Sequence, residues 1–265
     1  MTTAAENAAR EAGGVEPPDG QQLARMESLT AMAAGVAHDF NNHLATILGN
    51  TEILEQRLPP DSPLREHARR IHESAQTALD LTLDILTYTG RFRLNLAETD
   101  LAALAGQLVP ELRRVAGDGA TLDLRIAAPL PTVNLDGARV ARMIRLLVAN
   151  AAAAVAERSP PRAIAVDIGV VDSADELSAT GWIGEPLQPG RHASIAVADN
   201  GCGIGPDAWP RVFDPFFATR IRARGMGLPV VLGIVRAHHG AIRVESAPGR
   251  GTTVRVLLPI PAVHQ

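Results

Sequence analysis

Residues 35–42 read GVAHDFNN, and they lie midway along a helical pattern that begins near Gln22. Apolar residues recur along this pattern at alternating intervals of four and three, which is the spacing of a seam in a helical bundle. Because Val36 and Phe40 belong to the seam, His38 is expected to point away from it. The predicted seam residues are Leu29, Ala33, Val36, Phe40, Ile47 and Leu54, with His43 and Asn50 in the two remaining places.

A second helix is predicted after a proline-rich turn. The first pattern stops at Leu58, Pro59 and Pro60, and Pro63 stands where the first residue of the next helix would be. Two antiparallel helices joined by a short turn bury only one side of themselves, so a homodimer that forms a four-helix bundle is expected. The second helix runs to about Tyr88, and its stripe consists of Leu64, Ala68, Ile71, Ala75, Ala78, Thr82 and Ile85.

From about Arg91 onwards, helical and strand-like patterns occur in mixed order. Such an order predicts a two-layer α/β sandwich, so the fold class of the whole chain is α+β, a long helical hairpin followed by the sandwich. The predicted organisation is a disordered tail over residues 1–22, the hairpin over 23–92 and the sandwich over 93–265. The predicted helices span about 99–115, 137–156 and 226–238, and the predicted strands span 122–126, 132–135, 163–171, 194–198, 241–246 and 252–258.

Composition and charge exclude several classes of function. The formal net charge of −4 provides no bulk attraction to nucleic acid or to an anionic membrane. No apolar run is long enough for a membrane span, and charged residues interrupt the N-terminal stretch before a signal peptide could form. The single cysteine, Cys202, rules out an internal disulfide and suits a reducing compartment. We therefore expect a cytoplasmic protein without a nucleic-acid partner and without membrane insertion.

The first group with chemical potential is His38 with its neighbour Asp39. An exposed imidazole beside a carboxylate is suited to act as a nucleophile, because the acid can orient the ring and accept its proton. Asn42 lies one helical turn beyond His38, on the same face of the helix. A polar helix surface is the simpler interpretation of a lone histidine, but it does not account for the whole HDFNN stretch.

The second group follows a predicted strand, where residues 199–205 read DNGCGIG. Alternating glycines let the backbone bend sharply and approach a ligand closely. The carboxylate of Asp199, at the strand end, can accept a hydrogen bond from the exocyclic amine of a base.

Asn150, inside an otherwise apolar helix, needs a partner for its amide oxygen. A phosphate-bound Mg²⁺ could be the partner of this oxygen, and a hydrogen bond from a backbone N–H would satisfy it equally well.

The third group is the stretch Gly225 to Leu228, which is preceded by FDPFFATR over residues 213–220. Glycines at the N-terminus of a helix leave backbone N–H groups free to face phosphate oxygens. The basic residues Arg220, Arg222 and Arg224 could add to such a site, although a solvated charged loop is the usual meaning of such a run.

The order of these segments resembles the histidine kinases of the nitrogen-regulator type. Residues 35–42 resemble the H box of that family, and the helix that ends in Asn150 and Ala151 resembles its N box. Residues 199–205 resemble the G1 box and 213–217 the F box. Gly225 to Leu228 resemble the start of the G2 box, and residues 249–253 resemble the closing strand turn. The resemblance extends over about residues 23–260.

This resemblance implies a role for individual residues. His38 would accept the γ-phosphoryl group of ATP, Asp39 would act as the general base, and Asn42 would position water for dephosphorylation of the partner. Asn150 would bind Mg²⁺, and Asp199 would hold the adenine amino group. The implied nucleotide-binding residues are Asn150, Asp199, Gly201, Gly203, Thr219, Arg220, Gly225, Gly227 and Thr252.

The resemblance also implies partners. The phosphoryl group on His38 would pass to an aspartate of a response-regulator receiver domain, within an assembly in which the kinase is a homodimer. Because only a short tail precedes the first predicted helix, input from a separate sensor protein or constitutive activity is expected.

Three positions depart from the family pattern. Leu146 stands in place of the first Asn of the N box, Ala153 replaces a residue that is often polar or charged, and Pro229 replaces the third glycine of the G2 box. Pro229 has no N–H to donate to phosphate. These departures keep open a non-enzymatic phosphorelay adaptor with a degenerate ATP-binding domain. An ATPase of the gyrase or chaperone class shares the nucleotide-binding fold, but the His38 group argues against it.

Overall fold

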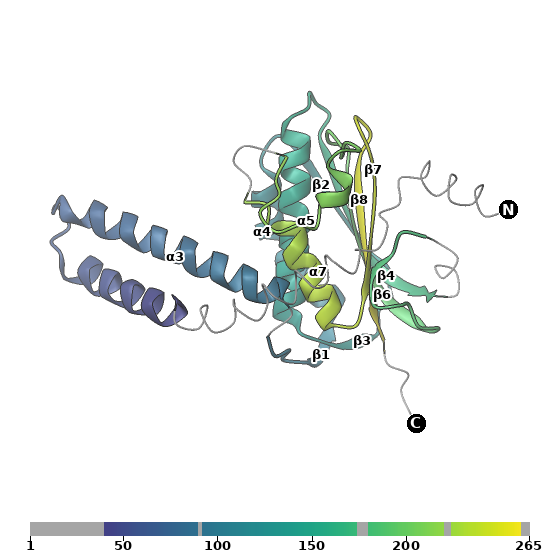
Figure 1. The fold of residues 1–265 in the computed structure, drawn as a ribbon, viewed down its shortest axis with the longest axis horizontal. Helices are drawn as coiled ribbons and strands as arrows, with labels where there is room; N and C mark the ends of the chain where they lie inside the picture. Colours follow the sequence, from purple (N-terminus) through teal and green to yellow (C-terminus); the bar gives the residue numbers. More distant parts are fainter. Residues whose placement is uncertain (1–39, 90–91, 174–179, 220–223, 261–265) are drawn as a thin grey trace. The chain divides into compact units, whose positions relative to one another are not determined.

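The computed structural model describes residues 40–89, 92–173, 180–219 and 224–260. The chain divides into two compact units, with the boundary between Phe92 and Arg93. Figure 1 shows that the first unit is a helical hairpin and that the second is a sheet covered by helices. This confirms the predicted fold class. The predicted tail over 1–22, together with His38, Asp39 and Arg220, lies outside the described residues.

The hairpin consists of a helix over residues 40–57 and of α3, Leu64–Tyr88. Its closing turn is stabilised by Arg65, whose guanidinium donates to the backbone oxygens of Glu55 (2.8 Å) and Leu58 (2.9 Å). These are carbonyl groups from the last turn of the first helix, which have no partner within that helix and carry its negative partial charge. Arg65 therefore fixes the end of one helix against the start of the next.

Small and polar residues fill the interior of the hairpin. Leu44, Ala68 and Ala75 are buried there. Thr51 is also buried, and its Oγ1 donates to the Leu48 carbonyl oxygen (2.8 Å) and lies 3.0 Å from Nδ1 of His72 on α3. Small residues let the two helices approach closely, and the Thr51–His72 contact links the two helices through polar side chains.

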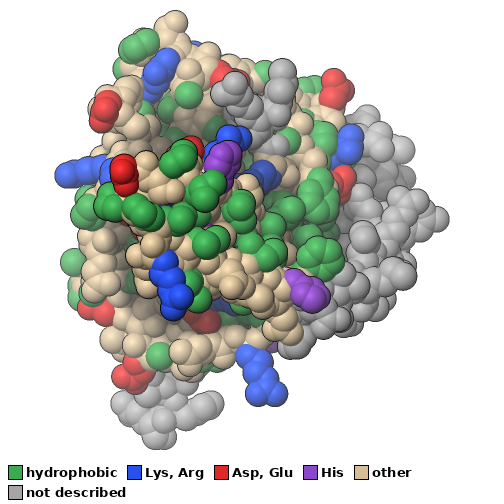
Figure 2. All heavy atoms as spheres, turned by 90° about the vertical axis from the view of Figure 1, so that its left-hand side faces the viewer, with side chains coloured by type: hydrophobic (Ala, Val, Ile, Leu, Met, Phe, Trp, Pro, Cys, Tyr) green, Lys and Arg blue, Asp and Glu red, His purple; other side chains and the backbone are tan. Residues whose placement is uncertain are grey.

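The predicted seam does not coincide with this interior. Among the described seam residues, Phe40, Ile47 and Leu54 lie at the surface of the single chain and not between its two helices. A helical hairpin has two apolar stripes, and only one of them can face its own second helix. The exposed stripe contains Phe40 (57% exposed), Ile47 (41%), Leu54 (46%), Leu64 (58%) and Ile71 (49%). Figure 2 shows hydrophobic side chains at the molecular surface among basic and acidic ones.

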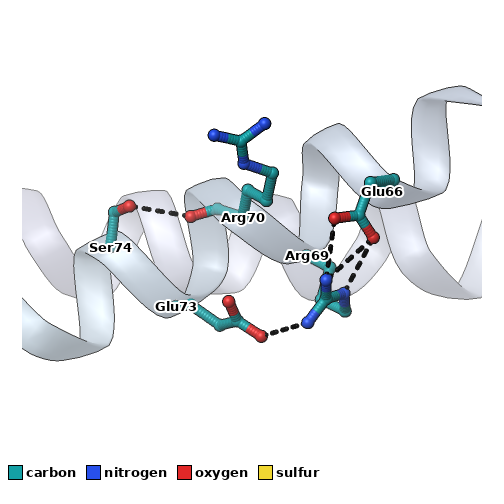
Figure 3. Close-up of polar contacts among 5 residues, drawn as sticks. All are labelled: Glu66, Arg69, Arg70, Glu73 and Ser74. Atoms are coloured by element: carbon teal, nitrogen blue, oxygen red, sulfur yellow. Dashed lines mark hydrogen bonds and ion pairs between the residues drawn. The ribbon is translucent and has the colours of Figure 1, made fainter.

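Another face of α3 carries charged residues. Arg69 forms ion pairs with Glu66 and Glu73, one turn before and one turn after it (Figure 3). The hydrogen bond from Arg69 lowers the pKa of the Glu66 carboxyl. Since all three side chains are more than half exposed, these pairs contribute little to stability and mark a solvated helix face.

The second unit is a six-stranded sheet with a separate pair of short strands. The sheet has the strand order β2-β4-β6-β8-β7-β5; β2 and β4 are parallel and the other neighbours are antiparallel. Its strands are β2 (Thr121–Ile126), β4 (Ala163–Asp172), β5 (Ile183–Gly184), β6 (Arg191–Asp199), β7 (Ala241–Ala247) and β8 (Gly251–Pro259). The separate antiparallel pair is β1 (Ala97–Asp100) with β3 (Thr132–Leu135).

Helices α4 (Leu101–Ala116), α5 (Gly137–Ala156) and α7 (Gly227–Ala237) cover one face of the sheet (Figure 1). Ile164, Val166 and Ile168 of β4 lie on this face because side chains alternate along a strand, and each is at most 2% exposed. Asp199, the last residue of β6, stands directly opposite Ile164 and so belongs to the same face. The sheet therefore presents a carboxylate on its helix-covered face, at the end of an interior strand.

Asp136 connects the start of α5 to two other segments. Its carboxylate caps α5 by accepting from the Arg139 N–H (3.1 Å), and it accepts from the N–H of Asn95 (3.0 Å). Its own N–H donates to Nε2 of His238 (3.1 Å), at the end of α7, while Nδ1 of His238 contacts the Ile234 oxygen (2.8 Å). Burial lowers the pKa of the His238 imidazole, which fits a neutral ring that accepts at Nε2.

Candidate functional site

Asp199 is held in place by the loop that follows it. The N–H of Gly201 donates to its Oδ1 at 2.7 Å, so the carboxylate is oriented by the backbone of the next turn. Across the sheet, Asp199 pairs with Thr252 of β8. A carboxylate at the strand end and a sharp turn after it are predicted from residues 199–205, and both are present.

The glycines around Asp199 are required because backbone segments approach one another closely. A Cβ on Gly201 would lie 2.6 Å from the Ala154 carbonyl carbon of α5. Gly203, with a φ of +72°, would place a Cβ 2.1 Å from the Ala247 oxygen. Gly251, with a φ of +90°, would place one 2.0 Å from the Asp199 oxygen. These glycines hold the Asp199 loop tightly between α5 and the turn that joins β7 to β8.

Asn150 lies on α5 one turn before Ala154, and it faces the start of α7. A Cβ on Gly227, the first residue of α7, would lie 2.9 Å from Oδ1 and 3.0 Å from Nδ2 of Asn150. The amide of Asn150 and the N-terminus of α7 are therefore neighbours. An amide oxygen beside the positive end of a helix can interact with a ligand that combines a cation with anionic groups.

The first turn of α7 retains a limited set of backbone donors. Pro229 is buried and has no N–H, while the N–H of Val230 already donates to the Met226 oxygen (3.0 Å). The N–H groups of Gly227 and Leu228 are the remaining donors in this turn. Proline near a helix start is compatible with the helix, so Pro229 leaves the fold intact. What it changes is the number of backbone N–H donors in the first turn of α7.

The segment 213–217 folds against the glycine that precedes α7. The N–H of Phe216 donates to the Gly225 oxygen (3.0 Å), and a Cβ on Gly225 would lie 2.5 Å from the Phe216 carbonyl carbon. Phe216 itself has a φ of +63° and is 60% exposed. The Phe217 ring lies under the Arg211 guanidinium, 4.3 Å from its centroid. Thr219 follows at an exposed position.

These contacts join most of the predicted nucleotide-binding residues into one continuous cluster. It runs from Thr252 through Asp199 and Gly201 to α5, and from Asn150 on α5 through Gly227 to Gly225. Segments that are far apart in the sequence thus meet at one end of the helix-covered face. Asn42 lies in the other unit, exposed on the helix over 40–57, where its backbone oxygen accepts from Thr46 Oγ1 (2.9 Å).

Three polar residues that support this cluster were not predicted. Arg158, beyond the end of α5, contacts carbonyl oxygens of the Asp199 loop. The side chain of Asn200 accepts from the Ala163 N–H (2.9 Å) and donates to the Pro161 oxygen (2.9 Å). Ser246 Oγ accepts from the Ile204 N–H (2.9 Å). Asn200 could have been suspected from its place in the turn, whereas the partners of Arg158 and Ser246 lie too far along the chain.

Comparison with known families identifies two matching domains. Residues 28–89 match the model of the His Kinase A (phospho-acceptor) domain. Residues 135–262 match the model of the histidine kinase-, DNA gyrase B-, and HSP90-like ATPase. The ATPase match includes the whole Asp199, Asn150 and Gly227 cluster and implies ATP binding.

Several curated proteins are similar over nearly the whole chain. The sensor histidine kinase ZraS of Escherichia coli K12 is 28% identical over 246 residues, which cover 90% of this chain and 48% of that kinase. The histidine protein kinase DivJ of Caulobacter vibrioides is 31% identical over 240 residues, covering 86% of this chain and 36% of DivJ. The chain thus spans about half or less of the length of these relatives.

A solved structure shares the fold. The crystal structure of full-length ShkA in complex with AMPPNP has a TM-score of 0.68 and 23% sequence identity, and the match covers 88% of this chain and 46% of that one. Among the described residues, no helix combines the length and the apolar character needed to cross a membrane.

Proposed function

Because this chain belongs to the histidine kinase family of two-component systems, we propose that it autophosphorylates His38 from ATP and transfers the phosphoryl group to an aspartate of a response-regulator receiver domain. The observation that carries this proposal is the cluster that unites Asp199, Asn150 and the start of α7. A receiver-domain phosphatase activity, with Asn42 positioning the water, belongs to the same proposal. We divide the chain into a tail (1–22), a phosphotransfer hairpin (23–92) and an ATP-binding domain (93–265).

In the ATP-binding domain, Asp199 would accept a hydrogen bond from the adenine amino group. Its orientation by the Gly201 N–H supports this role, because a carboxylate held in one direction can distinguish an amine from a carbonyl on the base. The N–H groups of Gly227 and Leu228 would donate to phosphate oxygens at the positive end of α7. Thr219, Arg220 and Thr252, together with the loops shaped by Gly203 and Gly225, would complete the contacts to the nucleotide.

The residues at the phosphate end fit Mg²⁺. The Asn150 amide supplies an oxygen ligand, the type that hard cations prefer, and it lies beside the helix start that would face the phosphates. Bound Mg²⁺ would neutralise charge on the phosphate oxygens. Asn150 would hold the ion and, with Gly227, orient the triphosphate.

In the phosphotransfer hairpin, a ring nitrogen of His38 would attack the γ-phosphorus. The N–P bond forms as the bond from phosphorus to the bridging oxygen breaks, ADP leaves, and Asp39 takes the proton of the other ring nitrogen. The receiver aspartate would then attack the same phosphorus, and the N–P bond would break.

The exposed apolar stripe of the hairpin supports a homodimer. Large apolar side chains at heptad spacing on one helical face are stabilised when a second copy covers them, and the family match to a phospho-acceptor domain is consistent with this.

A second candidate is a phosphorelay adaptor that receives its phosphoryl group from a receiver domain. The observation in its favour is Pro229, which removes one backbone donor from the start of α7. Leu146 and Ala153, which stand at positions that are often polar in the family, also favour the adaptor. In this case the hairpin would function without ATP turnover.

The experiment that decides between the candidates is labelling with γ-³²P-ATP and Mg²⁺. The unsubstituted chain, His38→Ala and Asp199→Asn are compared. The kinase proposal expects label in the first protein only, with the acid lability and alkali stability of a phosphoramidate. ATP binding retained by His38→Ala would show that this variant is folded. Absence of label from the unsubstituted chain, combined with labelling of His38 by a phosphorylated receiver domain, would support the adaptor instead.

A further inference from the structure

Arg158 lies two residues beyond the end of α5, where its guanidinium meets two loops. Its Nη1 lies 3.0 Å from the backbone oxygen of Asn200, 3.2 Å from that of Gly201 and 2.8 Å from that of Gly249. The first two oxygens belong to the loop after Asp199, and the third belongs to the turn between β7 and β8. One side chain just beyond α5 therefore contacts both the loop after Asp199 and the turn that packs against this loop.

Converging carbonyl oxygens need a cation. Three such dipoles that point toward one spot repel one another, and the C-terminal end of α5 adds negative partial charge nearby. A guanidinium is always protonated and offers several donors in a rigid plane, so it can neutralise the group and hold its geometry. The loop receives further support from Gly249, whose N–H donates to the Cys202 oxygen at 2.7 Å.

The peptide bond between Asn200 and Gly201 links Arg158 to the carboxylate. Its carbonyl oxygen accepts from Arg158, and its N–H donates to Asp199 Oδ1 at 2.7 Å. Because a peptide unit is planar and rigid, fixing the carbonyl also fixes the direction of the N–H. The direction of that N–H in turn determines how the Asp199 carboxylate is presented.

We infer that Arg158 is a positioning residue for base recognition: by holding the Asn200–Gly201 peptide, it orients Asp199 toward the exocyclic amine of adenine and so sets the preference for ATP over GTP. This inference rests on the proposed function, since it assumes that Asp199 recognises the base. Arg158 acts through the loop without touching the nucleotide. It should therefore affect recognition of the base and leave the binding of the phosphates unchanged.

The test is a competition experiment in which ATP and GTP displace a fluorescent ATP analogue from the full chain in the presence of Mg²⁺. For Arg158→Ala, the affinity for ATP is expected to fall about tenfold, the equivalent of one or two hydrogen bonds, while that for GTP stays the same. The ratio of the two affinities, which a general loss of stability would not change selectively, is the decisive readout.

Two further variants and one matched control complete the design. Arg158→Lys keeps a cation with three donors and should retain most of the ATP preference, whereas Arg158→Gln removes the charge and should behave like Arg158→Ala. Arg158→Gln can replace Arg158→Ala if that protein does not fold. The control is Arg162→Ala, which removes a nearby guanidinium. Arg162 donates to the backbone oxygens of Ala156 (3.2 Å) and Arg158 (2.8 Å), and these oxygens do not belong to the loop after Asp199.

An unchanged ratio in Arg158→Ala and Arg158→Gln, or parallel losses of ATP and GTP affinity, would overturn the inference while leaving the proposed function standing. An equal change of the ratio in Arg162→Ala would also overturn it. If the unsubstituted chain binds ATP no better than GTP, base recognition by Asp199 is wrong and the inference fails with it. Failure of the unsubstituted chain to bind any nucleotide would instead refute the kinase proposal itself.

Discussion

The lack of a side chain at Gly227 determines where the Asn150 amide lies, at the proposed phosphate end of the site. A methyl group at Gly227 would lie 2.9 Å from Asn150 Oδ1, which is closer than such atoms normally approach. Because the obstacle is the end of a flexible side chain, the amide can move aside. The helix would survive, and the amide would leave its position beside the start of α7.

We therefore predict that Gly227→Ala lowers the affinity for Mg-ATP by about tenfold with little loss of stability, since alanine is itself the better helix former. Calorimetric titration and thermal unfolding measure the two effects. The control is Gly106→Ala on α4, where no described atom lies within 4 Å of the new Cβ. That variant should bind ATP normally and be more stable by up to ~1 kcal/mol. Normal ATP binding by Gly227→Ala would refute the role given to Asn150.

We predict that His238 makes the stability of the ATP-binding domain dependent on pH. Burial lowers the pKa of its imidazole below the ordinary value, and the nearby charges of His239 and Arg139 act in the same direction. The hydrogen bond to Ile234 and the carboxylate of Asp136 oppose this effect. Protonation would remove the Nε2 lone pair that accepts from the Asp136 N–H.

The sign of the effect follows from the lowered pKa. Between the folded pKa and the unfolded value of about 6.5, the unfolded chain binds more protons, so stability rises with pH in this range. The stabilisation by neutral His238 is complete above about pH 6.5 and is lost as the pH falls toward the folded pKa. In His238→Gln this pH dependence should disappear, because the amide oxygen can still accept from Asp136 and does not titrate. Urea unfolding at several pH values measures the difference; parallel curves for the two proteins would contradict this account.

Individual site residues were predictable to different degrees. Asp199, Asn150 and Gly227 stand out in the sequence because a carboxylate, an amide and a glycine interrupt patterns that predict strands and helices. Arg158 gives no such signal, since an arginine after a helix is ordinary and its partners lie 42 to 91 residues further along the chain. Long-range polar contacts of this kind depend on the folded sheet.

At the scale of the elements, the hairpin has two apolar stripes with different roles. Leu44, Thr51, Ala68 and Ala75 face inward within one chain. The exposed stripe that includes Ile47 faces outward at heptad spacing, and it offers a second copy of the hairpin a surface to pack against.

We predict that Ile47→Asp converts the dimer to a monomer, because a carboxylate would be buried without a partner in the four-helix bundle. Sedimentation velocity measures the change in mass. Gln56→Glu, an exposed substitution on the same helix, introduces the same charge and should leave the dimer intact. The proposal for the dimer interface fails if Ile47→Asp sediments like the unsubstituted chain.

The structure also explains which elements the sequence analysis found and which it missed. Long periodic segments such as α5 and β8 were predicted because their patterns extend over many residues. The two residues of β5 are too short to form a recognisable pattern, and β1 lacks the alternation of buried and exposed residues that marks the equally short β3. Both strands exist because β7 and β3 offer them backbone partners. On the second helix, Ala68 and Ala75 were predicted in the apolar stripe and are buried, whereas Leu44 and Thr51 on the first helix were missed. A sequence pattern marks apolar faces without stating which partner covers each face.

At the scale of the whole molecule, the two units divide the chemistry between them. The unit from Arg93 onwards contains the cluster of Asp199, Asn150 and Gly227. It also has a core of its own, between the sheet and helices α4, α5 and α7. The other unit supplies the helical hairpin, whose family match over residues 28–89 includes His38. Proposed autophosphorylation therefore requires both units in one protein.

The most direct measurement is therefore identification of the phosphorylated residue after incubation of the full chain with Mg-ATP, by tandem mass spectrometry at neutral pH, where phosphohistidine survives. The account predicts a single phosphoryl group on His38 and none in the Asp199→Asn variant. A phosphoryl group on another residue, or an unmodified His38 in a protein that demonstrably binds ATP, would contradict it.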